Sequence, residues 1–214
     1  MKLQTQIPIQ KQPDNQIDYQ SKLLLLGSCF VENIGNKLDY FKFDSLQNPF
    51  GILFHPKAIE ILIHNSLHEK EYTEKDIFFH NEQWHCYDAH SKLSNNSKEK
   101  LLEILKIQLD LTAKRLNNST HIIITLGTAW VYKHFKTNLP VGNCHKVDQK
   151  EFVKQLMSVE DVINSVTMIV QQIHQVNPTA IIIFTVSPVR HIKDGFTENS
   201  QSKAHLISAL HHFI

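Results

Sequence analysis

Three short, nearly unbroken runs of apolar residues stand out in the hydrophobic pattern. They span Leu23–Leu26, Ile122–Leu126 and Ala180–Val186, and each ends at a small or turn-forming residue. Runs of this length without polar alternation are typical of strands that are buried on both faces of a parallel sheet. The chain is therefore expected to contain at least three such strands.

The segments between and after these runs repeat apolar residues at helical spacing. Pro56 suits the first turn of a helix and Ser97 suits an N-cap, while Ser158 begins a sequence that resembles a capping box. Helices are therefore predicted over residues 31–38, 56–67, 97–116, 158–176 and 202–214.

Strands that alternate with long helices predict an α/β fold. We expect a single domain over residues 1–214, built as a three-layer α/β/α sandwich around a mainly parallel sheet. Residues 77–87 depart from this pattern, because two short β-prone runs flank an Asn-containing turn, and they predict a small β-hairpin insertion. The length of 214 residues and the hydrophobic share of 42% suit a domain with a sizeable core.

Charge and cysteine usage limit the expected partners and location. The 22 Lys and Arg residues against 21 Asp and Glu residues offer no electrostatic basis for binding nucleic acid or an anionic membrane. The first residues lack the apolar core of a signal peptide, and no apolar run reaches the length of a membrane span. Cys29, Cys86 and Cys144 show no CxxC spacing and predict reduced thiols, so a cytoplasmic protein is expected.

The ends of the predicted strands carry the candidate chemistry. Gly27-Ser28, Gly127-Thr128 and Ser187-Pro188 follow the strands directly, and ligands of parallel sheets bind at the carboxyl edge. Ser28 also opens the next helix, so its hydroxyl would lie beside free N–H groups and the positive end of the helix dipole. These donors suit a nucleophile, because they stabilise the negative charge formed in acyl transfer. The alternative is that Ser28 only caps the helix.

Five motifs follow one another between the first strand and about residue 204. They are residues 27–35, which begin Gly-Ser-Cys-Phe, and residues 48–51, 127–132, 143–146 and 187–191. As an ordered set they resemble the GSCFA family, a branch of the SGNH/GDSL-like hydrolases. The resemblance implies a flavodoxin-like sheet and a serine esterase, acyl hydrolase or acyltransferase that acts on small or carbohydrate-linked acyl esters. It implies a small-molecule substrate and no metal or organic cofactor.

The resemblance also implies roles for residues at the strand ends. Ser28 would be the nucleophile, and the backbone N–H of Gly51 would be an oxyanion donor unless Gly51 is a plain turn glycine. Such hydrolases normally offer an Asn side chain after the second strand, and this sequence has none there. Thr128, Asn143 or Asn48 would fill that place. Asn143 is the preferred candidate, with a turn residue as its alternative.

The largest departure of this sequence from the family pattern concerns the general base. The wider superfamily carries Asp and His in a D-x-x-H segment near its C-terminus, and no such segment occurs after Ser187. We therefore expect either that a C-terminal portion is missing or that another histidine takes the serine proton. His191 is the first candidate and His145 the second, although His191 also suits a loop residue that contacts substrate. Arg190 would hold a substrate carboxylate or phosphate, or form an ordinary ion pair.

The sequence also leaves two alternatives to the esterase interpretation. Without the downstream Asp and His, the chain could be a non-catalytic domain that keeps the pocket and binds a ligand or partner. A metal-dependent hydrolase built on His80, His85, Cys86 and His90 is weaker, since strand alternation sends His85 and Cys86 to opposite faces. Cys29, beside the serine, is interpreted as a packing residue and not as a rival nucleophile.

Overall fold

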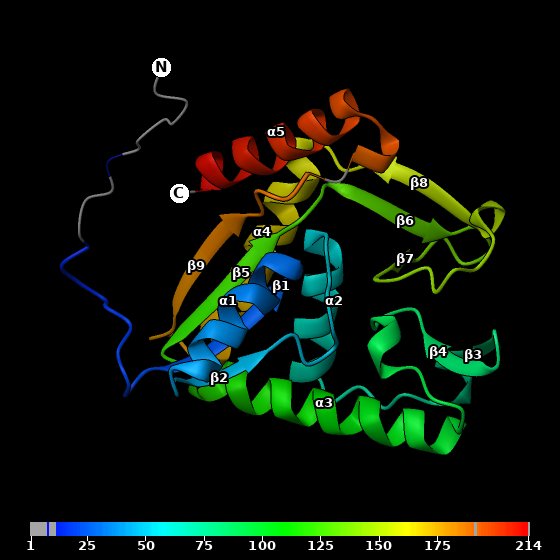
Figure 1. The fold of residues 1–214 in the computed structure, drawn as a ribbon, viewed down its shortest axis with the longest axis horizontal. Helices are drawn as coiled ribbons and strands as arrows, with labels where there is room; N and C mark the ends of the chain where they lie inside the picture. The colour runs from blue at the N-terminus through cyan, green and yellow to red at the C-terminus, as the bar shows by residue number, and fades with distance from the viewer. Residues whose placement is uncertain (1–7, 9–11, 191, 214) are drawn as a thin grey trace.

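Four parallel strands form the central sheet of the computed structural model, which describes residues 8, 12–190 and 192–213 (Figure 1). The strand order is β2-β1-β5-β9. The three predicted apolar runs are confirmed as neighbouring parallel strands, while β2 occupies a stretch for which no strand was predicted. The strands are β1 (Lys22–Gly27), β2 (Asp44–Gln47), β5 (His121–Leu126) and β9 (Ile181–Val186).

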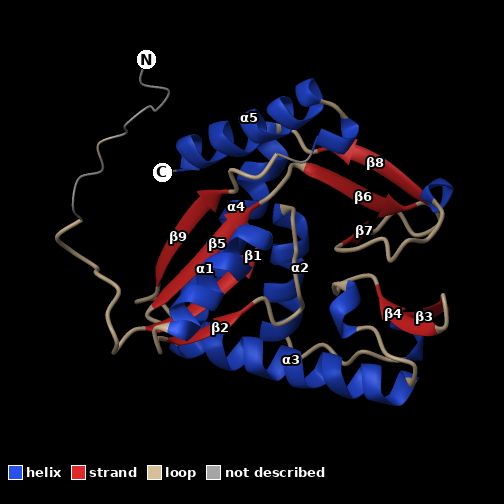
Figure 2. Ribbon diagram, viewed as in Figure 1, coloured by secondary structure: helices blue, strands red, loops and turns tan. Residues whose placement is uncertain are grey.

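Helices lie on both faces of this sheet, which confirms the predicted α/β layering (Figure 2). Ser97 caps α3 by accepting the Lys100 N–H, and Ser158 forms the predicted capping box with Asp161. The last helix begins at Phe196, ahead of its predicted start. The α-helices of the described part are α1 (Cys29–Tyr40), α2 (Pro56–Leu67), α3 (Lys98–Asn118), α4 (Val159–Val176) and α5 (Phe196–Phe213).

Alternate side chains of β1 enter two separate hydrophobic clusters. Leu24 and Leu26 pack with side chains of α2, α3, α4 and α5, whereas Leu23 and Leu25 pack with side chains of α1. Each of the four is essentially inaccessible to solvent, and burying a leucine fully contributes about 1.5–3 kcal/mol. This two-sided burial fixes the strand and with it the position of the turn that follows Gly27.

Two antiparallel sheets accompany the central sheet. β3 (Ile77–His80) and β4 (Gln83–Cys86) form the predicted hairpin, and its turn residues Asn81 and Glu82 both have positive φ, as a type I′ turn requires. A second sheet of order β7-β6-β8 was not predicted. Its strands are β6 (Trp130–His134), β7 (Pro140–Val141) and β8 (Phe152–Leu156).

Short 3₁₀ helices punctuate the loops, and those in the described ranges are η1 (Glu74–Asp76), η2 (Ser91–Leu93), η3 (Gln149–Glu151) and η4 (Ile192–Asp194). No helix in the part of the chain that the structure describes combines the length and the apolar content needed to cross a bilayer.

The strands β1, β5 and β9 end at one edge of the sheet, and α5 runs past these ends (Figure 1). Two neighbouring side chains tie α5 to this edge. Ser202 Oγ accepts the Ala129 N–H at 2.8 Å, and Lys203 Nζ donates to the Gly127 carbonyl at 2.6 Å. The carboxyl edge, where the candidate residues were expected, is thus closed on one side by the last helix.

Candidate active site at the carboxyl edge of the sheet

Ser28 occupies the turn between β1 and α1, where the sequence predicts a nucleophile or a helix cap. It stands at the N-cap position with extended backbone angles (φ −74°, ψ 175°), yet its hydroxyl makes no capping hydrogen bond. The residue is fully buried, and Ser28 Oγ has no hydrogen-bond partner among the described residues. Buried hydroxyls are nearly always hydrogen-bonded, because an unpaired one carries the full cost of its desolvation. Capping therefore does not explain this serine.

The backbone around Ser28 is held by the end of β5 and by the loop that precedes α2. The Ser28 N–H donates to the Thr125 carbonyl at 3.1 Å, and the Leu53 N–H donates to the Gly27 carbonyl at 3.1 Å. Gly27 has a φ of +129°, and a Cβ there would lie 2.1 Å from the Thr125 oxygen. Only glycine satisfies both conditions, so Gly27 sets the sharp turn that presents the serine.

Asn48 is the second polar residue of the edge with an unused group. Its Oδ1 accepts the Gly27 N–H at 2.8 Å, which fixes the side chain beside the residue that precedes Ser28. Its Nδ2 is buried and has no partner in the described part of the chain. Asn48 has a φ of 40°, a conformation that Asn tolerates better than most residues. A donor and a hydroxyl, both buried and both unpaired, thus flank the same glycine.

Gly51 is placed by the same turn, but its N–H already has a partner. That N–H donates to the Asn48 carbonyl at 2.7 Å, so the structure does not offer it to a substrate. The left-handed φ of +73° is what a turn glycine provides, and a Cβ at this position would lie 2.4 Å from the His90 Cβ. The geometry is that of the turn alternative, and the expected donor role of Gly51 finds no free group.

Thr128 is also engaged within the fold. Its Oγ1 accepts the Trp130 N–H at 3.0 Å and pairs with Ser202 Oγ at 3.0 Å, so the hydroxyl links the end of β5 to α5. The neighbouring Gly127 carbonyl accepts from Lys203. Sequence reasoning singled out Thr128 and missed Lys203, because α5 is remote in sequence from the strand end that it contacts.

His145 and Asn143 lie together at the β3–β4 hairpin. His145 is buried, with Nε2 bonded to the Cys86 carbonyl at 2.8 Å and Nδ1 to Ser91 Oγ at 3.0 Å. Asn143 Oδ1 accepts the His145 N–H at 2.8 Å. Both ring nitrogens are therefore occupied, and these contacts describe a buried turn that anchors the hairpin.

Burial lowers the pKa of two histidines and makes acid destabilisation an expected result. Desolvation brings the pKa of His145 and of His55 to about 4. His55 is neutral as folded, since Nδ1 accepts the Ala58 N–H while Nε2 bonds the Val141 carbonyl. The unfolded chain binds these protons near pH 6.5 and the folded chain only near pH 4, so stability is lost as pH falls through that window.

Each histidine is expected to contribute up to about 3 kcal/mol to this loss by pH 4. Urea unfolding followed from pH 7 to pH 4 measures it. His55→Asn keeps a capping oxygen but does not titrate, so this variant should show a flatter pH dependence than the wild type. Parallel curves for the two proteins would contradict the assignment.

Arg190 is exposed on the loop after β9, and His191 lies outside the described residues. Cys29 is half-buried in the first turn of α1. Among the described ranges, no three His, Cys, Asp or Glu side chains come together as a metal site would need, and His85 instead bonds Ser94 Oγ and the His80 carbonyl.

His90, which the sequence suggested only as a metal ligand, lies against the turn that carries Asn48 and Gly51. It packs against Gly51, and its neighbour Lys92 pairs with Glu32 of α1 at 2.7 Å. Desolvation, followed by the charge of Lys92, lowers the pKa of His90. His90 is therefore a neutral imidazole near the N-terminal turn of α1 at neutral pH.

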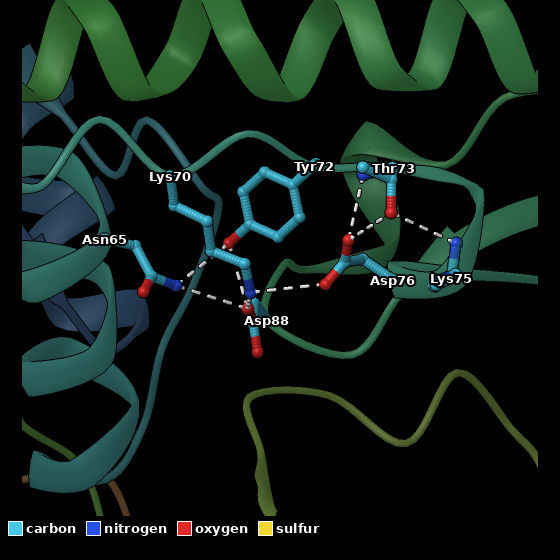
Figure 3. Close-up of polar contacts among 7 residues, drawn as sticks. All are labelled: Asn65, Lys70, Tyr72, Thr73, Lys75, Asp76 and Asp88. Atoms are coloured by element: carbon cyan, nitrogen blue, oxygen red, sulfur yellow. Dashed lines mark hydrogen bonds and ion pairs between the residues drawn. The ribbon is translucent and has the colours of Figure 1, made fainter.

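A polar cluster holds the loop that carries His90 (Figure 3). Asp88 Oδ2 accepts from Tyr72 Oη at 2.9 Å, from Lys70 Nζ at 3.2 Å and from Asn65 Nδ2 at 3.4 Å. Asn65 belongs to α2, so the cluster joins the hairpin loop to the main body. A charged network with several partners positions a loop more firmly than an isolated surface ion pair.

Comparison with known proteins assigns the chain to a family. The family model of the GSCFA family matches residues 22–214, and the chain belongs to that family. No curated protein and no solved structure matches it. The matched range spans β1 to α5 and includes every residue of the site described above.

Proposed function

We propose that this GSCFA protein is an SGNH-like serine esterase or acyltransferase that acts on small or carbohydrate-linked acyl esters in the cytoplasm. One observation carries the proposal: the Ser28 hydroxyl at the start of α1 is buried, makes no capping hydrogen bond and has no other partner among the described residues. Leaving a buried hydroxyl unpaired costs about 1–3 kcal/mol of free energy, so a protein retains such a group where function requires it.

The proposed reaction proceeds through an acyl-enzyme on Ser28. Ser28 Oγ forms a bond to the acyl carbon while its proton passes to a histidine base, and the ester C–O bond then breaks. The leaving alcohol takes the proton from that histidine. Water or a second alcohol repeats the sequence in reverse order and releases the acyl group, so no outside reductant, oxidant or cofactor enters the balance.

The negative oxygen of the tetrahedral intermediate needs donors that are already oriented. Asn48 Nδ2 is the donor we propose, because it is a buried amide group without a partner in the described part of the chain and Oδ1 of the same side chain is fixed by the Gly27 N–H. The N-terminal turn of α1 supplies the positive end of a helix dipole beside it. This assignment replaces Gly51, whose N–H closes the turn.

The base is proposed to be a histidine from a loop at the same edge. His191, a few residues after β9 in the sequence, is the candidate that the sequence offered first, and His90, which packs against Gly51, is the candidate that the structure adds. His145 is the weaker candidate, since both of its ring nitrogens are bonded within the hairpin region. Arg190, exposed beside His191, would serve a substrate carboxylate or phosphate.

Substrate access requires a movement, because Ser28 is fully buried in the described structure. The same burial favours a second candidate function, a non-catalytic domain that retains the pocket and binds a ligand or partner. Turnover of any acyl ester that depends on Ser28 decides for the enzyme. Saturable ligand binding without turnover would decide for the binding domain.

The Asn48→Asp variant tests the proposed donor. Asp keeps an oxygen that accepts the Gly27 N–H, but it loses the NH₂ group and adds negative charge. We expect kcat for a small acetyl ester to fall on the order of a hundredfold or more, as for other lost oxyanion donors. Steady-state kinetics with a series of nitrophenyl esters measures this loss.

Asn143→Asp is the matched control. It likewise keeps the oxygen that accepts the His145 N–H, and it makes the same chemical change in a different loop. Its kcat should stay within about threefold of the wild type, since it is not among the proposed oxyanion donors. The donor assignment would be reversed if Asn143→Asp lost turnover and Asn48→Asp retained it.

A further inference from the structure

Lys203 brings a positive charge to the serine site from α5. Its Nζ donates to the Gly127 carbonyl at 2.6 Å, at the end of β5. A Cβ built on Gly127 would lie 3.1 Å from the Ser28 Cβ, so this glycine contacts the serine directly. The ammonium also interacts electrostatically with Cys29, the residue after the serine. Lys203 therefore lies close to the turn that joins β1 to α1.

The surroundings of this ammonium are unusual for a lysine. It is half-buried, and within the described residues no carboxylate lies at ion-pair distance from its Nζ, whereas surface lysines such as Lys92 and Lys98 do pair. Desolvation lowers the pKa of Lys203. A desolvated cation without a counter-ion is costly, and such groups cluster at functional sites.

Docking of α5 does not require this charge. The adjacent Ser202 already ties the helix to the strand end through the Ala129 N–H and Thr128 Oγ1. A neutral donor would satisfy the Gly127 carbonyl equally well. What a lysine adds at this place is positive charge beside Ser28 and Cys29, with hydrogen-bonding capacity left over, because an ammonium carries three N–H donors.

Building on the proposed function, we propose that Lys203 stabilises the negative charge that develops at Ser28 during acylation and deacylation. The ammonium is held on the Gly127 carbonyl and acts across the short distance between Gly127 and the serine. It remains protonated throughout, so the proton of the hydroxyl still goes to the histidine base. The same ammonium also lies within electrostatic range of the Cys29 side chain.

Lys203→Gln is the test, because Gln can still donate to the Gly127 carbonyl but carries no charge. We expect kcat for a small acyl ester to fall at least about tenfold with little change in KM, as for lost electrostatic stabilisation. Lys203→Arg should restore most of the rate. Ser202→Ala, the control for helix docking, should lower the melting temperature without the loss in kcat.

A second measurement does not depend on ester turnover. Alkylation of Cys29 by iodoacetamide at pH 7, followed by mass spectrometry, should slow several-fold in Lys203→Gln and should be retained in Lys203→Arg and Ser202→Ala. If no ester is turned over but Cys29 alkylation follows this order, the proposed function fails while the electrostatic role stands. Equal alkylation rates in all four proteins, or a kcat loss in Ser202→Ala equal to that in Lys203→Gln, would overturn the proposal.

Discussion

Ser28→Ala is expected to abolish ester turnover and to leave the fold as stable as the wild type or more stable. Loss of a nucleophile lowers kcat by about a thousandfold or more. Stability should not fall, because the hydroxyl caps no helix and its removal relieves an unpaired buried group. Esterase assays and thermal melting on the same preparation give both numbers.

Ser97→Ala is the matched control for stability. Ser97 Oγ accepts the Lys100 N–H and caps α3, so its loss should cost about 1 kcal/mol without affecting turnover. Cys29→Ala should be nearly silent in both assays, apart from the loss of the alkylation site. A destabilised Ser28→Ala that kept full activity would mean that the serine has a structural role only.

Gly27→Ala is expected to unfold much of the population or to lower stability by about 3 kcal/mol or more. The added Cβ would meet the Thr125 carbonyl at 2.1 Å, and alanine rarely adopts a φ of +129°. Since the same carbonyl accepts the Ser28 N–H, the clash also disrupts this hydrogen bond between the end of β5 and the Ser28 turn. Thermal denaturation should show a drop of about 6–12 °C for a chain of this size.

Gly35→Ala is the control for this substitution. Gly35 is a buried helical glycine whose added Cβ would meet chiefly the end of the Gln47 side chain, which can move. Alanine is favoured over glycine in a helix by about 1 kcal/mol, so the net change should stay within about 1 kcal/mol. Equal melting temperatures for Gly27→Ala and the wild type would contradict the account of the turn.

The secondary structure was predictable where one local signal decided it. The run at Leu23–Leu26 is buried on both faces, and the caps at Ser97 and Ser158 begin their helices as expected. The sheet β7-β6-β8 was not predicted, because its strands are short and half-exposed, with polar residues interspersed. β2 was not predicted either, because its four residues include few apolar side chains and take their conformation from pairing with β1.

The site was predictable only as far as the backbone turn at Ser28. Asn48 was one of three candidates that the sequence offered for a donor, and its bond to Gly27, 21 residues away, is what singles it out. Lys203 contacts Gly127 across 76 residues of sequence, and no local pattern reports such a contact. Gly51 looked like a donor because glycine suits both a donor and a turn. The bond from its N–H to the Asn48 carbonyl favours the turn role, and only the folded chain shows that bond.

Covalent labelling of Ser28 tests the central claim most directly. The wild-type protein is incubated with fluorophosphonate probes of several sizes, and the adduct is mapped by peptide mass spectrometry. The account predicts one adduct, on the peptide that contains Gly27-Ser28-Cys29, with labelling lost in Ser28→Ala and kept in Cys29→Ala. The absence of a Ser28 adduct with every probe, together with no turnover of any ester, would contradict the acyl-enzyme and leave the ligand-binding domain in its place.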